Sequence, residues 1–426
     1  MTAYRKFWIL LIFSTLSLAV CAQQGHEDPQ QEPTGEAAAL SEAEHNPCGH
    51  SLSEEEEFNA GDNAVHHIAD ANAIQVIGET YFHLPCFLYA PGHGWTVATT
   101  AAFEPHHHGN GTRSKDGYVL VHGNIMRLIN PELATGEYEV SDYFHRDTTA
   151  DGKTTTRYSA QVNGVCEPLE ARSTLDGGIM GGGITSFYDF SITRNVFTML
   201  LTAVLLFLFF RAAAKGAMRR DGQAPKGLQN FVEPFVTFIR DEVAIPNIGP
   251  KYEKYLPYLL AVFFFILGLN LIGQIPFFPG SGNVTGNISV TLALAVLTFL
   301  ITSFSGNKHY WQHVLWMPGV PVALKVIIIT PIEVLGLVLK PFTLMLRLFA
   351  NITAGHMVIL SFVSLIFIFG NAGQSMNGSI AGVAASIPLT LFMMTLELLV
   401  AFIQAFIFTM LSAVYFGSAV EEPHHH

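Results

Sequence analysis

The apolar residues of this 426-residue chain gather in long, nearly uninterrupted runs after residue 185. Residues 193–210, about 256–277 and about 290–304 each approach the ~20 helical residues that cross the hydrocarbon core of a bilayer. Few charged residues interrupt these runs. The pattern therefore predicts three membrane-spanning helices in this part of the chain.

Two further apolar runs, residues 321–370 and 379–416, are too long for a simple crossing. About fifty helical residues at 1.5 Å each would reach roughly 75 Å, whereas the hydrocarbon core is only ~30 Å thick. These segments must therefore bend, tilt strongly or lie partly along the membrane, and Pro341 is a natural place for a bend. Two helices that lean so heavily are expected to wrap around a partner.

The segments between the first two predicted spans indicate the orientation of the chain. Lys and Arg gather between residues 211 and 226, which marks the cytoplasmic side by the positive-inside rule. Apolar residues recur at helical intervals between residues 230 and 244, as in an amphipathic helix on a membrane surface. With about five crossings, the N-terminal part lies outside the cytoplasm and the C-terminus inside it.

The first 22 residues have the three parts of a secretory signal peptide. Arg5 and Lys6 precede an apolar stretch, and small residues suited to cleavage end at Ala22. An alternative is a lipoprotein site at Cys21, although the valine before this cysteine is larger than such sites prefer. A cleaved signal peptide agrees with an extracytoplasmic position of the next segment, where disulfides persist.

Composition separates this next segment from the apolar runs. The chain is 50% hydrophobic and only 13% charged, below the quarter or so of a soluble domain, which indicates a membrane protein. Residues 23–185 nevertheless hold 24 Asp and Glu against 7 Lys and Arg, which argues against a nucleic-acid partner.

Residues 23–60, rich in Gln, Glu and Pro, are expected to be disordered. Strand-like stretches separated by turns predict a β-rich extracytoplasmic domain at residues 61–185.

Cysteine and histidine in this acidic half raise two questions of chemistry. Cys48, Cys86 and Cys166 permit at most one intramolecular bridge, and their spacing does not choose it. The same half holds 12 of the 18 histidines, some clustered at 66–67 and 106–108. Histidines without a ligand spacing such as HxxxH are typical of a solvated surface, so we expect no metal, with metal binding as the alternative.

Six ionisable residues lie within the last two apolar runs: Lys325, Glu333, Lys340, Arg347, His356 and Glu397. A mid-membrane Arg costs roughly 2.5 to 3.5 kcal/mol on insertion scales, so such a residue normally faces protein or water. Ala350, Asn351 and Ala354 share the helical face of Arg347. Because small side chains let another helix approach closely, this face is expected to receive a partner that brings a carboxylate to the arginine.

Other polar residues of these runs point to ion transfer. His356 lies nine residues after Arg347 and therefore half a turn away from its face, while Glu397 and Gln404 share a face of the final helix. A histidine, a carboxylate and amides are common materials of a proton path through a membrane. The alternative is a set of structural pairs that only satisfy each other.

Two segments, LKPFTLMLRLFANITAGHMV and LELLVAFIQAFIFTMLSAVYFGSA, resemble the signature regions of subunit a of the F-type ATP synthase. The resemblance covers residues 186–422, with supporting pieces in HIADA, LNLIGQIP and IEVLGLVLKPF. It implies an all-α polytopic membrane domain of about five transmembrane helices, the last two long and strongly tilted, with an amphipathic surface helix. Residues 423–426 form a short tail, and the β-rich domain is longer than the N-terminal segment of most members.

The resemblance also implies a role for each matched residue. Arg347 matches the family's essential arginine, which meets each carboxylate of the rotating c-ring and separates two half-channels. His356 and Glu397 occupy positions that many bacterial members fill with Glu and His, so one acid and one imidazole are kept near each other. Asn351 and Gln404 match the polar positions beside them. Glu333 matches a less strictly required acid, which we assign to a proton path.

The function implied is that of the proton-conducting stator subunit of an ATP synthase in a bacterial inner membrane. Its expected partners are the c-ring, the peripheral-stalk b subunits, the rest of the complex and lipid. The chain has no Gly-rich Lys loop for phosphates, so we expect no nucleotide site, no catalytic site of its own and no cofactor. Na⁺ is the alternative coupling ion. One competing class is a self-contained ion channel or secondary transporter; such transporters often contain internal repeats, and we find none in this sequence. A second competing class is a metal- or partner-binding receptor, but this function would leave Arg347 unexplained.

Overall fold

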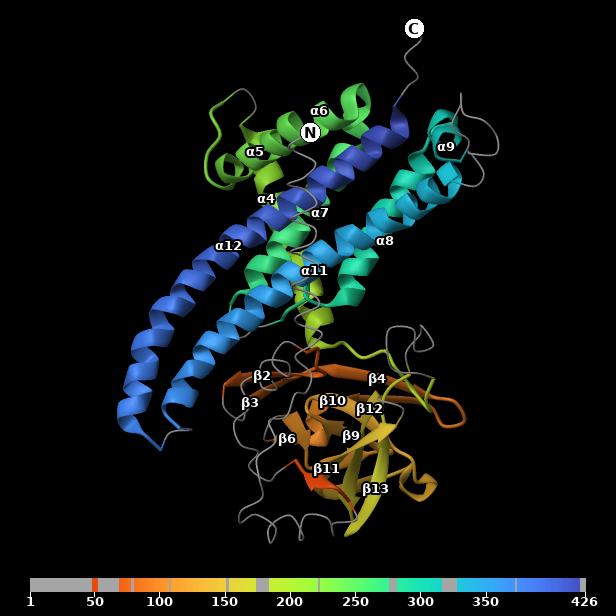
Figure 1. Ribbon diagram of the computed structural model, residues 1–426, viewed down its shortest axis with the longest axis vertical. Helices are drawn as coiled ribbons and strands as arrows, with labels where there is room; N and C mark the ends of the chain where they lie inside the picture. The colour runs from red at the N-terminus through yellow and green to blue at the C-terminus, as the bar shows by residue number, and fades with distance from the viewer. Residues whose placement is uncertain are drawn as a thin grey trace.

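The computed structural model describes residues 48–52, 69–77, 80–106, 109–150, 153–173, 184–220, 223–275, 282–315, 328–371 and 374–421 (Figure 1). The expected signal peptide, the lipoprotein alternative, most of the acidic segment and the histidines at 66–67 and 107–108 lie outside these residues, as does Lys325. Within the described ranges the chain forms a β part followed by a helical part, as the sequence predicts. The expectation of disorder for residues 23–60 is wrong at their described end, because His50 and Ser51 pair with β11.

The β part is built from short strands and one long hairpin. Its strands are β1 (His50–Ser51), β2 (Ala73–Ile77), β3 (Thr80–His83), β4 (Pro85–Ala90), β5 (Gly94–Thr99), β6 (Pro105–His106), β7 (Asn110–Gly111), β8 (Arg113–Lys115), β9 (Tyr118–Val121), β10 (Asn124–Leu128), β11 (Glu137–Ala150), β12 (Lys153–Val162), β13 (Val165–Glu170) and β14 (Tyr188–Asp189). The strand pairings among the described residues are antiparallel.

The largest sheet of this part closes on itself. Its strands follow the order β1-β11-β12-β13-β10-β9-β8, and β11 also pairs with β8. Closure pairs the backbone N–H and C=O groups of strands that would otherwise lie at an open edge. Strand β9 is buried on both faces: Val119 and Val121 belong to one apolar cluster, whereas Tyr118 and Leu120 pack with Leu88 of β4 in another. The three-stranded sheet β14-β4-β5 thus covers the outside of the closed sheet.

Local chemistry and one disulfide fix the β12–β13 hairpin. Asn163 and Gly164 both have left-handed backbone angles, φ 53° and 79°, as expected of a two-residue Asn-Gly hairpin turn. A disulfide joins Cys48, just before β1, to Cys166 of β13, whereas Cys86 is free and buried. The sequence allowed one bridge but did not choose its members, and the fold selects Cys48 and Cys166.

The helical part begins directly after β14. Its elements are α4 (Arg194–Arg219), α5 (Leu228–Phe238), the π-helix η4 (Ile239–Ala244), α6 (Ile245–Ile248), η5 (Gly249–Lys251), α7 (Tyr252–Gly273), α8 (Ile288–Ser305), α9 (Lys308–Leu315), α11 (Thr330–Phe369) and α12 (Met376–Val420). Five of the described helical stretches, one of them running from α5 through α7, are long and apolar enough to cross a membrane. This agrees with the prediction of a polytopic membrane protein, while the position of α5 on a membrane surface stays a prediction.

The two longest helices run side by side. Helix α11 has 40 residues and α12 has 45, or roughly 60 and 68 Å at 1.5 Å per residue. Figure 1 shows them crossing α7 obliquely, with the turn between them beside the β part. Both helices continue through an internal proline, Pro341 in α11 and Pro388 in α12. The expected bend at Pro341 therefore does not interrupt the helix.

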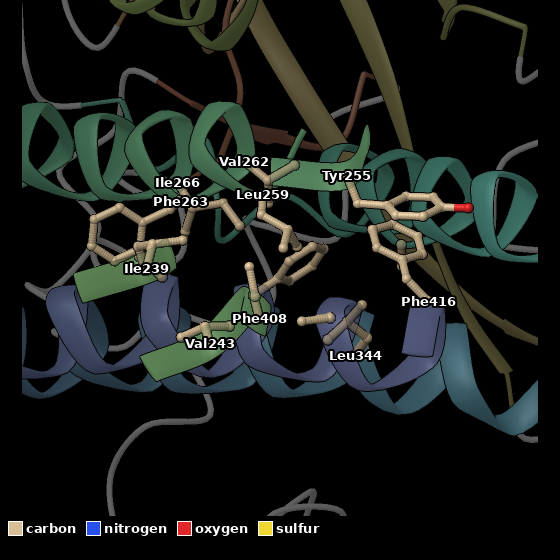
Figure 2. Packing of buried hydrophobic residues seen from close by; sticks show 14 of the residues in the cluster. Ile239, Val243, Tyr255, Leu259, Val262, Phe263, Ile266, Leu344, Phe408 and Phe416 are labelled. Carbon is tan, nitrogen blue, oxygen red and sulfur yellow. The ribbon is translucent and has the colours of Figure 1, made fainter. Parts of the chain in front are cut away.

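The largest apolar core lies where η4, α7, α11 and α12 meet. Figure 2 shows Leu259 of α7 packed toward Phe408 of α12 and Tyr255 toward Phe416, with Leu344 of α11 in the same cluster and Phe263 beside Ile239 of η4. The ring of Tyr255 stacks on that of Phe416 with centroids 5.0 Å apart. This packing fixes α12 against the rest of the membrane part and so positions the polar residues that α12 carries.

Gly417 is the point of closest approach between α12 and the segment around α6. A Cβ atom at this position would lie 1.9 Å from the carbonyl oxygen of Asn247, a backbone atom that cannot rotate away. We expect Gly417→Ala to destabilise the folded chain by about 3 kcal/mol, the upper end of usual overpacking costs. The measurement is the yield and thermal midpoint of the purified chain. Gly336→Ala is the matched control, because nothing lies within 4 Å of its Cβ position; equal behaviour of both variants would contradict the prediction.

Hydrogen bonds connect the β part directly to the first turn of α4. The backbone N–H of Arg194 donates to the carbonyl of Ala71 at 2.7 Å. The carboxylate of Asp70 accepts from the backbone N–H of Asn195 at 3.1 Å. Arg194 is buried here although it carries a charge. The β part is therefore attached to α4 by more than the covalent chain.

Candidate functional site

Arg347 lies near the middle of α11, beside residues that the rest of the described chain leaves exposed. Its side chain is partly buried, whereas Ala350, Asn351 and Ala354 on the same helical face are exposed. Among the described residues, no carboxylate lies within 4.0 Å of the Arg347 guanidinium. The row of small residues predicted from the sequence is thus an open surface beside a cation without an ion-pair partner in the described chain.

His356 of α11 and Glu397 of α12 meet between these two helices. Nδ1 of His356 lies 3.0 Å from Oε1 of Glu397 on α12, and the carboxylate is almost fully buried, with 4% of the Glu397 side chain exposed. Gly355 makes this approach possible, since a Cβ there would lie 3.1 Å from the same Oε1 atom. The structure therefore brings together the acid and the imidazole that the sequence expected to be neighbours.

Buried polar residues continue from this pair toward α7. Gln404 lies on the same buried side of α12 as Glu397, as its spacing predicted. Between them, the carbonyl of Ala401 accepts a 3.3 Å hydrogen bond from Nδ2 of Asn270 on α7. Oδ1 of Asn270 accepts in turn from the hydroxyl of Thr285 at 2.7 Å. These groups extend the polar character of the site into the apolar core.

Sequence reasoning did not single out Asn270 and Thr285. Asn270 is an amide within the apolar helix α7, and this is the signal that would have marked it. Thr285 stands in a loop rich in polar residues, and such residues are too common in loops to be informative. Only the packing of α7 against α12 makes them part of the same cluster.

A second polar group lies toward the N-terminal end of α11. Lys340 is one of several polar residues that line a small hollow between α8, α9, α11 and α12, together with Thr298, Thr302, Tyr310 and Tyr415. Nζ of Lys340 lies 5.6 Å from the ring centre of Tyr415. Glu333 lies in the first turn of α11, partly buried. Neither Glu333 nor Lys340 is part of the His356–Glu397 cluster.

Arg347 stands between these two polar groups along α11. At 1.5 Å per residue it is roughly 14 Å from His356 in one direction and roughly 21 Å from Glu333 in the other. The arrangement places a cation on an open face, with titratable residues toward both ends of the same helix.

The amino-acid sequence matches the family model described as ATP synthase A chain over residues 196–417, which is more than half of the chain. The chain belongs to the ATP synthase A chain family. This confirms the resemblance to subunit a of the F-type ATP synthase, and the match includes Arg347, His356, Glu397 and Gln404. A second model, a domain of unknown function, matches residues 64–151 of the β part.

Curated members of the ATP synthase A chain family are similar over the helical part. ATP synthase subunit a 2 of Chlorobaculum tepidum is 48% identical over 245 residues, which are 56% of this chain and 66% of that protein. The subunit a 2 of Prosthecochloris aestuarii is 46% identical over 56% of this chain and 71% of its own length. ATP synthase subunit a of an Anaeromyxobacter species is 43% identical over 59% of this chain and 60% of its own length. The matched regions thus span about two thirds of these relatives.

Proposed function

We propose that this chain is the proton-conducting stator subunit of an F-type ATP synthase in a bacterial inner membrane. The observation that carries the proposal is Arg347, a cation on an open row of small residues in a chain of the ATP synthase A chain family. A ring of c subunits would pass along this face, and each would bring one carboxylate to the arginine. Peripheral-stalk b subunits would hold the chain still against that rotation.

The His356–Glu397 pair forms the centre of the proposed outer half-channel. Imidazole and carboxylate exchange protons readily, and the 3.0 Å approach of Nδ1 of His356 to Oε1 of Glu397 would allow transfer once the two groups align. Gln404 and Asn270 supply further hydrogen-bonding groups in an otherwise apolar core, and Asn351 lies between the pair and Arg347 along α11. A proton from outside the cytoplasm would pass these groups and neutralise a rotor carboxylate.

Arg347 separates the two half-channels in this proposal. A neutral carboxylic acid can rotate through lipid, but near a fixed cation the ionised form is favoured, so the acid releases its proton. Because the guanidinium stays protonated at any cellular pH, it also opposes the passage of a free proton along α11. The released proton would leave toward the cytoplasm by the end of α11 that carries Glu333. Rotation would then drive ATP synthesis in other subunits.

The proposed topology follows from this path. The β part, which extends past the predicted bounds 61–185 to β1 and β14, would lie outside the cytoplasm. The helical part from α4 onward would form the membrane domain, and the C-terminus would be cytoplasmic. The basic residues after α4 support this orientation, since Lys and Arg concentrate on the cytoplasmic side of membrane proteins.

Proton flux through liposomes distinguishes this function from that of a self-contained channel. We expect liposomes with this chain alone to conduct no more than empty ones under an imposed potassium diffusion potential, because the rotor carboxylates are missing. Liposomes with the complete membrane sector, without the soluble catalytic part, should conduct protons, as followed with a pH-sensitive dye. A sector whose rotor carboxylate is replaced by an amide is the control. Equal flux from the chain alone would favour the channel, and flux that requires Na⁺ would change the proposed ion.

A further inference from the structure

The three-stranded sheet β14-β4-β5 has one face built into the core and one face that is open. In β4, Cys86, Leu88 and Ala90 are fully buried beneath the sheet. The alternate residues Phe87 and Tyr89 point the other way. We call this open side the hairpin face; it consists of Phe87, Tyr89, Trp95, Val97, Tyr188 and Phe190.

Large apolar side chains are paired across the hairpin face. Tyr89 lies opposite both Trp95 of β5 and Tyr188 of β14, and Phe87 lies opposite Val97. The Tyr89 and Trp95 rings are 5.1 Å apart, and the Trp95 and Phe190 rings 5.7 Å. Despite these contacts, Trp95 is 62% exposed, Val97 65% and Phe190 52%. An ordered aromatic patch of this kind is unusual on a water-facing surface.

Charged side chains are absent from the stretch that contains β4 and β5, in an otherwise acidic domain. The sequence from residue 80 to residue 103 contains no Asp, Glu, Lys or Arg. Residues 23–185 as a whole hold 24 acidic and 7 basic residues. Anionic lipid headgroups would therefore repel most of the domain surface, which would remain hydrated. The residues of the hairpin face are uncharged, so this face is not repelled by the headgroups and loses no charge hydration when it contacts lipid.

The hairpin face is continuous with the start of a membrane-spanning helix. Phe190 is only three residues before Thr193, the N-cap of α4. The backbone N–H of Phe190 donates to Phe87 and that of Ile192 to Pro85, which fixes the entry of the chain into α4 to strand β4. On the neighbouring strand β3, the ring of Phe82 contacts Phe197 in the first turn of α4 at 5.5 Å. Figure 1 shows β4 on the side of the β part nearest to the helices.

We propose that the hairpin face rests on the lipid bilayer around α4, with its aromatic rings at the level of the headgroups. Trp and Tyr favour this region because their rings are apolar while their N–H and O–H groups remain hydrated. The rigid connection to α4 holds the face at the edge of the bilayer without a further anchor. The β part is thereby a lipid-contacting platform, and this role does not depend on the proposed ion path.

Fluorescence of Trp95 in the full-length chain tests the contact. Trp8→Phe, Trp311→Phe and Trp316→Phe leave Trp95 as the sole tryptophan, and the protein is placed in phosphatidylcholine nanodiscs. We expect a blue-shifted emission that is quenched severalfold more by lipid brominated near the headgroup than by lipid brominated near the chain end, with weak quenching by aqueous iodide. Emission like that of water-exposed tryptophan, quenched by iodide and not by lipid, would overturn the proposal.

A tryptophan elsewhere on the domain supplies the matched control. Val165 of β13 is 59% exposed and belongs to the closed sheet. Val165→Trp in a Trp95→Phe background should therefore respond to iodide and not to brominated lipid. Equal lipid quenching at both positions would mean general adhesion of the domain and would contradict a specific hairpin face.

Photocrosslinking in the assembled complex separates lipid from protein as the occupant. A photoreactive amino acid at Val97 replaces an exposed side chain and leaves the core beneath β4 unchanged. Lipid adducts at Val97, several times more abundant than those from the same probe at Val165, are the expected result. Adducts with another subunit in place of lipid would show that the face is a protein interface and would overturn the proposal.

Discussion

Arg347→Ala is expected to abolish both ATP-driven proton pumping and proton-driven ATP synthesis in membrane vesicles while the complex still assembles. A guanidinium 4 Å from a carboxylate contributes about 4 kcal/mol at an effective dielectric constant of about 20. Every 1.4 kcal/mol is a factor of ten in an equilibrium, so loss of this interaction should lower coupled transport by at least about 100-fold. Dye quenching measures pumping, and luciferase light output measures synthesis.

Two further variants show which property of Arg347 matters. Arg347→Lys keeps a positive charge but loses the planar fork that binds a carboxylate, so we expect it to remain strongly impaired. Arg219→Ala removes an arginine at the end of α4 and should leave both activities near those of the wild type. Native gels establish assembly in each case. Normal pumping and synthesis by assembled Arg347→Ala complexes would refute the proposed coupling role.

The second large effect is expected at the His356–Glu397 pair. Removing one partner leaves a buried polar or charged group without its 3.0 Å contact, at a cost of about 1 to 3 kcal/mol or more. We therefore expect His356→Ala and Glu397→Gln each to slow ATP-driven pumping by about 10- to 100-fold, since 1.4 kcal/mol corresponds to a factor of ten. The initial rate of dye quenching is the measurement.

A double-mutant cycle tests whether the two residues act together. If they form one proton-transfer unit, the double variant should be scarcely slower than the slower single variant, because contacting residues are not additive. Exchanging them as His356→Glu with Glu397→His should restore part of the rate, since one acid and one imidazole remain in place. Ser418→Ala, at an exposed position of α12, is the control. Additive losses with no recovery on exchange would indicate separate roles.

The disulfide and the long helices show where local sequence information ends. Cys48, Cys86 and Cys166 were equivalent in the sequence, and only the pairing of β12 with β13, together with the position of β1 on β11, brings two of them together. Pro341 was expected to mark a bend because proline removes a backbone hydrogen bond. Helix α11 is continuous through Pro341 and contacts α12 on both sides of it, at Lys340–Tyr415 and at His356–Glu397, while the bend itself stays a prediction.

The sequence by itself determined that the chain is a membrane protein of the ATP synthase A chain family, the approximate positions of its apolar helices, and the row of small residues that accompanies Arg347. These are local properties, since the length of an apolar run and the spacing of residues along one helix depend on that segment alone. Tertiary structure decided the 3.0 Å meeting of His356 with Glu397, the hydrogen bond from Asn270 of α7 to α12, and the attachment of the β part to α4. Each of these contacts joins separate elements, and which faces meet depends on how their side chains fill the shared space.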